Sequence, residues 1–398
     1  MVPSRRLGRL GSGVFARNDL RKQAYRLAGG ASKAWPLVDL SLGSTDLLPP
    51  DLILQAMRTG LQDPESSSYC LHAATKPFRE AVADWSQRRF GISVDAEREV
   101  LLLVGSQEGT AHLPLAVLDP GDAALILDPS YPSHRGGLVL ADARIESLQL
   151  KPEQGWRPDF QSLTNSQWEQ LQMMVLGFPH NPTAEVGEQS WLDEAMAHGL
   201  RHQLVVAHDN PYVDLALDGE APALLRSPGW REWGIEFFSF SKAWCLGGYR
   251  LAFAIGAEPL IKALRELKGV VDFNQSLALQ RGAIAALREL PDWPKQHLTV
   301  YRQRRDRTLA ALAALGWHAP RPSMSLYLWL PLPAWAAQSH CNDEALAADL
   351  LDQTGIALTP GSGFGPGGSG WLRMALVRPV EELEAAIERL APWWHAHR

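Results

Sequence analysis

Cysteine is scarce in this sequence, and neither long hydrophobic runs nor an excess of positive charge is present. Cys70, Cys245 and Cys341 lack the spacing of a zinc site and are too few for a disulfide framework. They predict a reducing, cytoplasmic location and no structural metal. No apolar run is long enough to span a membrane. A net charge of −6 does not favour nucleic acid as a partner.

The chain has 398 residues, of which 46% are hydrophobic and 21% charged. These are values of a globular protein, and this length predicts two domains or one large α/β domain. The first 22 residues are rich in arginine, with no acid before Asp19, and indicate a flexible docking arm. The arginines are Arg5, Arg6, Arg9, Arg17 and Arg21.

Short apolar runs alternate with helix-like stretches between about residues 100 and 260. Helical spacing is present over 109–118 and 190–200. The alternation predicts an α/β fold with a mainly parallel sheet wrapped by helices, in which ligands bind outside the carboxyl ends of the strands. The predicted buried strands are 100–104, 124–127, 173–176, 204–207, 237–240 and 251–255.

The pattern changes after about residue 290. A long helix is expected over 293–315, a strand over 326–330, a Gly-rich loop over 361–370 and a closing helix over 380–390. We therefore expect residues 61–290 to form a large domain and 291–398 a smaller α+β domain. Residues 1–60 are expected to form the N-terminal arm and part of the smaller domain.

The residues around Lys242 carry the strongest chemical signal. Lys242 follows Ser239 and Ser241, lies between two apolar runs, and precedes Arg250 by eight residues that include two glycines. Ser and Arg side chains bind phosphate, glycines let the backbone come close, and a lysine amine condenses with aldehydes. The aldehyde cofactor that carries a phosphate is pyridoxal phosphate. A lone lysine is usually a solvated charge, but the flanking buried strands favour a chemical role.

Polar or aromatic side chains follow other predicted strands. Ser106 opens a helix and could bind an anion or cap the helix. Tyr131 could stack on a flat heterocycle or pack in a turn. Asn181 could donate to a phenolate oxygen or belong to an ordinary turn. Asp209 needs a cationic partner if it is buried, with a capping role as the alternative, and Tyr212 could bind a ring oxygen.

In this order, these motifs resemble those of the class I/II pyridoxal-phosphate aminotransferases, which have the aspartate aminotransferase fold type. The resemblance covers about residues 40–390, and its Ser-x-Ser-Lys-x7-Arg element is highly specific. It implies the fold of type I pyridoxal-phosphate transferases, with 61–290 as the cofactor-binding domain. Residues 42–50 are similar to the corresponding segment of diaminopimelate aminotransferases and their relatives.

The resemblance also implies roles at the cofactor. Lys242 would form the Schiff base and Asp209 would pair with the pyridine nitrogen, which makes both residues and Tyr212 catalytic candidates. Tyr131 would stack on the ring. The remaining implied contacts are Asn181 and Tyr212 at the ring oxygen, and Ser106, Gln107, Ser239, Ser241 and Arg250 around the phosphate.

Further implied roles concern the substrate and a second subunit. Arg373 would clamp the substrate α-carboxylate, with Gly43 and Asn181 nearby. Tyr69 matches a tyrosine that reaches the phosphate of the neighbouring subunit, which predicts a homodimer. Two residues depart from the family pattern: Ala74 and Ala184 stand where glycine is usual, and both bear on loop shape and substrate.

The expected activity is ping-pong transfer of an amino group between an L-amino acid and a 2-oxo acid, with diaminopimelate among the candidate substrates. A β-lyase or decarboxylase on the same scaffold is the alternative. A pyridoxal-phosphate-binding regulatory domain is a remoter one, because such regulators carry a helix-turn-helix module and only about 40 residues precede the family segment. A nicotinamide dehydrogenase is disfavoured, since no Gly-x-Gly-x-x-Gly follows an early strand.

Overall fold

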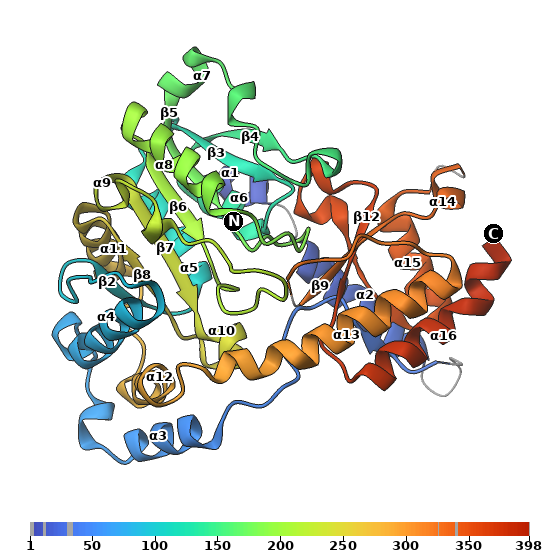
Figure 1. Ribbon diagram of the computed structural model, residues 1–398, viewed down its shortest axis with the longest axis horizontal. Helices are drawn as coiled ribbons and strands as arrows, with labels where there is room; N and C mark the ends of the chain where they lie inside the picture. Colours follow the sequence, from blue (N-terminus) through green and yellow to red (C-terminus); the bar gives the residue numbers. More distant parts are fainter. Residues whose placement is uncertain (1–3, 11–12, 30–34, 325, 339–340, 398) are drawn as a thin grey trace.

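The computed structural model describes residues 4–10, 13–29, 35–324, 326–338 and 341–397. Its centre is a seven-stranded sheet of order β2-β8-β7-β6-β5-β3-β4, shown in Figure 1. The strands are β2 (Val100–Leu103), β3 (Ala123–Asp128), β4 (Arg144–Gln149), β5 (Leu171–Leu176), β6 (Val205–Asp209), β7 (Gly234–Ser239) and β8 (Ala252–Gly256).

Five neighbouring strands of this sheet, from β4 to β7, are parallel, while β8 is antiparallel to both β7 and β2. All six predicted strands are present, which confirms the expected α/β fold with a mainly parallel sheet. The one strand of this seven-stranded sheet that was not predicted is β4, which lies at its edge. Its residues are mostly exposed or half-buried, so it lacks the apolar run by which the others were found.

Helices cover both faces of the sheet (Figure 1). One face packs against α5 (Ser106–Val117), α6 (Pro132–Leu140) and α11 (Glu258–Val271). The other packs against α4 (Lys76–Phe90), α8 (Gln189–His202) and α12 (Leu277–Glu289). The short helices are α7 (Asn165–Gln170), α9 (Trp230–Trp233) and α10 (Phe240–Ala243).

A second hydrophobic cluster lies under a small antiparallel sheet of order β11-β12-β9. Its strands are β9 (Tyr327–Pro331), β11 (Thr359–Pro360) and β12 (Trp371–Ala375), and the helices around it are α14 (Ala334–Gln338), α15 (Asp343–Thr354) and α16 (Val380–His397). The long helix α13 (Trp293–Leu315) has the predicted bounds and runs from the large sheet to α16 (Figure 1).

The N-terminal part of the chain packs in two places. Strand β1 (Val38–Asp39) pairs with β10 (Ile356–Ala357), beside the smaller sheet. Helix α3 (Asp51–Leu61), in contrast, packs on α12. The boundaries proposed from sequence at about residues 60 and 290 stay a prediction.

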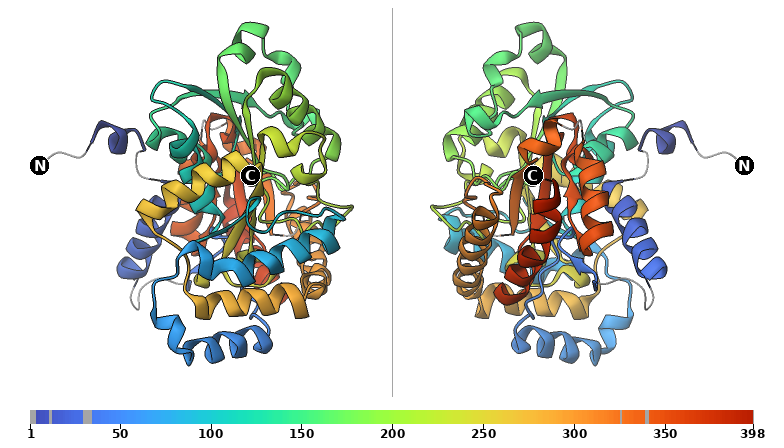
Figure 2. Two further views of the ribbon diagram at one scale, coloured as in Figure 1. Left: turned by 90° about the vertical axis from the view of Figure 1, so that its left-hand side faces the viewer. Right: turned by 90° about the vertical axis from the view of Figure 1, so that its right-hand side faces the viewer.

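The Arg-rich segment is helical where it is described, rather than the flexible arm expected from sequence. Helix α1 (Arg5–Leu10) contacts α6, and α2 (Val14–Gly29) contacts α15 and β11. Figure 2 shows α1 at the outer edge of the molecule. An ion pair between Arg9 and Asp142 connects α1 to the chain just after α6. Of the helices in the described ranges, none is both long and apolar enough to cross a membrane.

Candidate active site

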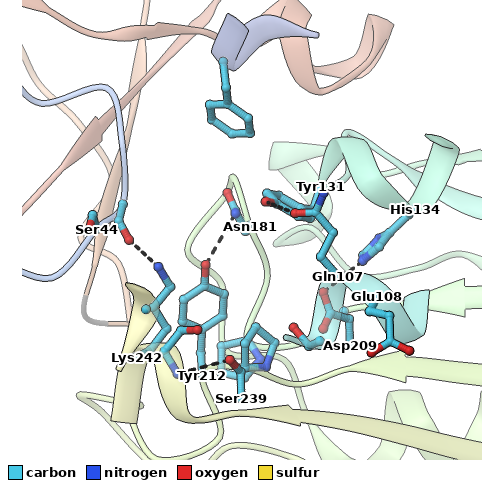
Figure 3. Close-up of a pocket in the computed structure, with 18 of the residues that line it drawn as sticks. Ser44, Gln107, Glu108, Tyr131, His134, Asn181, Asp209, Tyr212, Ser239 and Lys242 are labelled. Atoms are coloured by element: carbon cyan, nitrogen blue, oxygen red, sulfur yellow. Dashed lines mark hydrogen bonds and ion pairs between the residues drawn. The ribbon is translucent and has the colours of Figure 1, made fainter. Parts of the chain in front are cut away.

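A cavity of about 690 Å³ lies at the carboxyl ends of β3, β5, β6 and β7, where the sequence places its motifs. This volume is typical of small-molecule sites. Twelve of the thirteen predicted site residues line it, and Figure 3 shows several of them from different strands around one space. They are Gly43, Ser106, Gln107, Tyr131, Asn181, Asp209, Tyr212, Ser239, Ser241, Lys242, Arg250 and Arg373.

Lys242 lies on α10, a single turn that directly follows β7. The Ser239 side chain caps this turn by accepting a hydrogen bond from the Ser241 amide at 3.1 Å. The Lys242 ammonium donates to the Gly43 carbonyl across the cavity. Burial lowers the pKa of Lys242; Tyr327 opposes this, and the positive charge of Arg373 adds to it. A lower pKa raises the fraction of the neutral amine, which is the nucleophilic form.

Asp209 is the last residue of β6, and only one of its two carboxylate oxygens has a hydrogen-bond partner among the described residues. Its Oδ2 lies 3.1 Å from His134 Nε2, whereas its Oδ1 is buried and has no hydrogen-bond partner among the described residues. An unpaired buried carboxylate oxygen is costly, so this atom fits a ligand that carries an N–H group. A protonated pyridine nitrogen is such a group. Asp209 does not cap a helix, so the alternative given with the sequence does not apply.

A buried network fixes the end of β6 behind Asp209. The Phe178 amide donates to His208 Nε2 at 3.0 Å, so His208 Nδ1 carries the proton and donates to Glu236 at 2.8 Å. Asn210 also donates to Glu236 at 2.8 Å. Because these side chains are fully buried, their hydrogen bonds hold β6 and β7 in register beneath the cavity.

The start of α5 and Arg250 form a cradle for an anion. Gly105 is the N-cap residue, with φ of 84°, and Ser106 follows as the first residue of the helix, so the Ser106 side chain is not the cap. A Cβ on Gly105 would overlap the Arg250 guanidinium. Free N–H groups at a helix start, a hydroxyl and a guanidinium are together suited to phosphate. The predicted phosphate residues therefore do meet in space.

Arg373 lies on β12 and is 1% exposed, so it is not a surface arginine. Nη1 donates to Asn181 Oδ1 and Nη2 to the Ser41 carbonyl, both at 2.8 Å. Its Nε is buried and makes no hydrogen bond within the described ranges. A guanidinium has five N–H donors, so donors remain for a carboxylate. The rings of Tyr327, Phe364 and Phe15 enclose it at 4.3, 4.8 and 5.3 Å.

Tyr327, on β9, is a site residue that sequence reasoning missed. Its hydroxyl lies 3.1 Å from that of Tyr212, which also accepts from Asn181 Nδ2 at 3.4 Å. Burial acts to raise the pKa of Tyr327, but Arg373 and Lys242 outweigh it and lower that pKa. Burial and Tyr327 raise the pKa of Tyr212. In the sequence, Tyr327 belongs to an apolar strand and carries no separate signal; His134 and Phe15, which also line the cavity, carry none either.

Tyr69 is the predicted site residue that does not line the cavity. Its side chain is 85% exposed and lies against Phe273, with ring centroids 6.0 Å apart. The two residues that depart from the family pattern, Ala74 and Ala184, differ in backbone conformation. Ala74 lies in a 3-10 turn, whereas Ala184 has φ of 61°, a conformation in which glycine is unstrained.

Comparisons with known proteins agree with this geometry. Residues 36–390 match the sequence family described as aminotransferase class I and II. An LL-diaminopimelate aminotransferase from Dehalococcoides mccartyi is 36% identical over 92% of this chain and 93% of its own length. An LL-diaminopimelate aminotransferase from Moorella thermoacetica is 33% identical over 98% of both chains.

Solved structures show the same relationship. A probable N-succinyldiaminopimelate aminotransferase from Thermus thermophilus is 38% identical, with a TM-score of 0.88 over 95% of this chain and 99% of its own. Substrate-bound BacF from Bacillus subtilis is 27% identical, with a TM-score of 0.93 over 99% and 98%. An aspartate aminotransferase from Thermus thermophilus is 26% identical, with a TM-score of 0.89 over 98% and 99%. This chain therefore belongs to the class I and II aminotransferase family and is a pyridoxal-phosphate-dependent aminotransferase.

Proposed function

We propose that this aminotransferase acts on an amino acid of the diaminopimelate type. Several sequence relatives carry that name and match over nearly the full length of both chains. A structural relative at 38% identity is a probable N-succinyldiaminopimelate aminotransferase. The observation that carries the chemistry is one cavity that holds a half-buried amine, Lys242, and a buried guanidinium with an unused donor, Arg373.

We further propose how the cofactor is held. Ser106, Gln107, Ser239, Ser241 and Arg250 would bind its phosphate, and Asp209 Oδ1 would accept from its ring nitrogen. Tyr131 would stack on the ring, while Asn181 and Tyr212 would reach the ring oxygen. When bound, the cofactor supplies an aldehyde for a Schiff base and an electron sink for the substrate.

The remaining steps belong to side chains of this chain. The Arg373 guanidinium binds and orients the substrate α-carboxylate, with the Gly43 backbone beside it, so that the Cα–H bond faces Lys242. The neutral Lys242 amine would take the proton from the substrate Cα and pass it on to the carbon of the cofactor's aldehyde group; in the second half-reaction it would move a proton the opposite way, to the Cα of the product amino acid. Asp209, held in place by its contact with His134, would keep a proton on the ring nitrogen.

A panel of amino donors tests the substrate. Holoenzyme is assayed with LL-diaminopimelate, its N-succinyl derivative, L-aspartate and L-phenylalanine, each with 2-oxoglutarate, and Lys242→Ala is the inactive control. We expect a diaminopimelate-type donor to give the highest kcat/KM and parallel double-reciprocal lines. A tenfold preference for aspartate or phenylalanine would refute the diaminopimelate-type substrate but leave the assignment as an aminotransferase unchanged. Product formation without any oxo acid would indicate a lyase.

We also propose a two-fold homodimer in which Tyr69 reaches the phosphate site of the other subunit. Exposed apolar side chains gather near Tyr69, at the end of α11 and before α4, and such patches usually mark interfaces. They are Leu71 (56% exposed), Val270 (84%), Val271 (51%) and Phe273 (46%). Light scattering should give twice the chain mass, and Tyr69→Phe should weaken cofactor binding. A monomer that keeps full activity on dilution would contradict this assembly.

A reducing compartment is the last part of the proposal. Cys70, Cys245 and Cys341 are free thiols. This supports the cytoplasmic location expected from sequence, because free thiols are typical of reducing compartments. Fractionation of the native cells, with immunodetection of the chain, tests it, and recovery outside the cytoplasm would contradict it.

A further inference from the structure

A buried acid lies at the phosphate end of the cavity. Glu108 is the third residue of α5, and it lines the same cavity as Ser106, Gln107 and Arg250. Figure 3 shows Gln107 and Glu108 on one side of that space. Glu108 Oε2 accepts a hydrogen bond from the Val104 amide at 2.5 Å, and the side chain is 6% exposed. A carboxylate here repels a phosphate dianion and competes with it for the positive end of α5.

Lys268 supplies the compensating charge from α11, which packs on α5. Its Nζ lies 3.1 and 2.9 Å from the two oxygens of Glu108 and 2.9 Å from Asp272, and its side chain is 3% exposed. Burial acts to raise the pKa of Glu108, but His112, Lys268 and the Val104 amide outweigh it and lower that pKa. Glu108 is therefore ionised and paired.

The same groups have the arrangement of a metal site. Ligand atoms of Glu108, His112 and Asp272 lie within 4.8 Å of one another. The Lys268 ammonium, however, already contacts both carboxylates at 2.9 Å. The cation in this cluster is therefore the lysine, and a divalent ion would have to displace a buried ion pair.

We propose that Lys268 is a positioning residue for the cofactor phosphate: by neutralising Glu108 and fixing its carboxylate on the Val104 amide, it makes the start of α5 an acceptable site for a dianion. The inference rests on the assignment of pyridoxal phosphate as cofactor. Lys268 does not itself line the cavity. Lys268 acts through Glu108, so we expect it to affect the binding of the phosphate group and not that of the aldehyde or the ring.

The test compares two ligands that differ in the phosphate alone. Apoenzyme prepared from holoenzyme is titrated with pyridoxal phosphate and with pyridoxal, by absorbance and by quenching of tryptophan fluorescence. The readout is the Kd of pyridoxal divided by the Kd of pyridoxal phosphate. Lys268→Met should weaken pyridoxal phosphate at least about tenfold and leave pyridoxal within about threefold. Lys262→Met is the matched control, because Lys262 lies on the same helix with its side chain 64% exposed.

A double variant separates charge balance from a structural role. Glu108→Gln with Lys268→Met removes both charges, so the Kd ratio should return to within about threefold of wild type. Equal weakening of pyridoxal and pyridoxal phosphate by Lys268→Met would overturn the proposal, as would a double variant no better than Lys268→Met. If Lys268→Met does not fold, the double variant and Glu108→Gln alone still decide: the ratio in both must equal or exceed that of wild type. Failure of wild type to bind pyridoxal phosphate would instead refute the cofactor assignment.

Discussion

Replacing Arg373 by lysine tests the carboxylate site most directly. The guanidinium is held by Asn181 and the Ser41 carbonyl at 2.8 Å, while its Nε makes no hydrogen bond in the described chain. A lysine keeps the charge but loses the planar fork, so it cannot hold both anchors and both carboxylate oxygens. A hydrogen bond to a charged group contributes about 1.5–3 kcal/mol, which corresponds to roughly 10- to 150-fold in binding.

Arg373→Lys should therefore raise KM for the amino acid and for the oxo acid by that factor, because both carry the carboxylate. Cofactor affinity, measured by absorbance, should stay unchanged, since the phosphate residues lie on other elements. Arg378→Lys is the matched control: it lies five residues later, 41% exposed in a surface ion pair. Unchanged KM for both substrates in Arg373→Lys would refute the reasoning and leave the carboxylate site unassigned.

Three further changes address the cofactor side. Asp209→Asn should lower kcat about 10²-fold or more, because the carboxylate charge opposite the ring nitrogen is lost while the shape remains; near-normal single-turnover rates would show a misassignment. Gly105→Ala should weaken cofactor binding in an absorbance titration, because the methyl group overlaps Arg250 and φ is 84°; unchanged affinity would contradict the cradle. In the apoenzyme, the lowered pKa of Lys242 means that the unfolded chain binds more protons between the folded pKa and about 10.4. Its unfolding free energy should therefore rise with pH in that window, and Lys242→Met should remove this contribution from the denaturation curves.

The sequence predicted the sheet because most of its strands are buried on both faces. Strands β2, β3, β5, β6, β7 and β8 each contain an apolar run, and α13 has the bounds that its sequence indicated. The edge strand β4 has mixed polarity and was missed. Helices α3 and α12, which pack on each other, were also not predicted.

Prediction of the site was limited in a similar way. Lys242 and Asp209 belong to local sequence motifs at strand ends, so the neighbouring residues in the sequence are enough to identify them. Tyr327 enters the site because β9 pairs with β12 and brings its hydroxyl to Tyr212. His134 meets Asp209 across 75 residues of chain. Contacts of this kind depend on tertiary packing, and a single sequence carries no signal for them.

The segment from Ser41 to Asp46 joins the two sides of the active site. The Ser41 carbonyl accepts from Arg373 at 2.8 Å, and the Gly43 carbonyl accepts from Lys242. The far end of the segment is fixed by Asp46, which forms a bidentate ion pair with Arg304 of α13 at 2.7 Å for both contacts. Arg304 is nearly fully buried, so this pair is a fixed anchor rather than a surface contact.

With the roles proposed for Arg373 and Lys242, this arrangement would account for the recognition of α-amino acids as a class. Two residues of chain span at most about 7 Å, so the Ser41 and Gly43 carbonyls keep Arg373 and Lys242 close together. The α-carboxylate and the Cα of an amino acid are directly bonded, and a guanidinium and an amine held at short range can engage both at once. The side chain of the substrate takes no part in that geometry. On this proposal, the class of substrate follows from residues 41–46, while the choice within the class depends on the rest of the cavity wall.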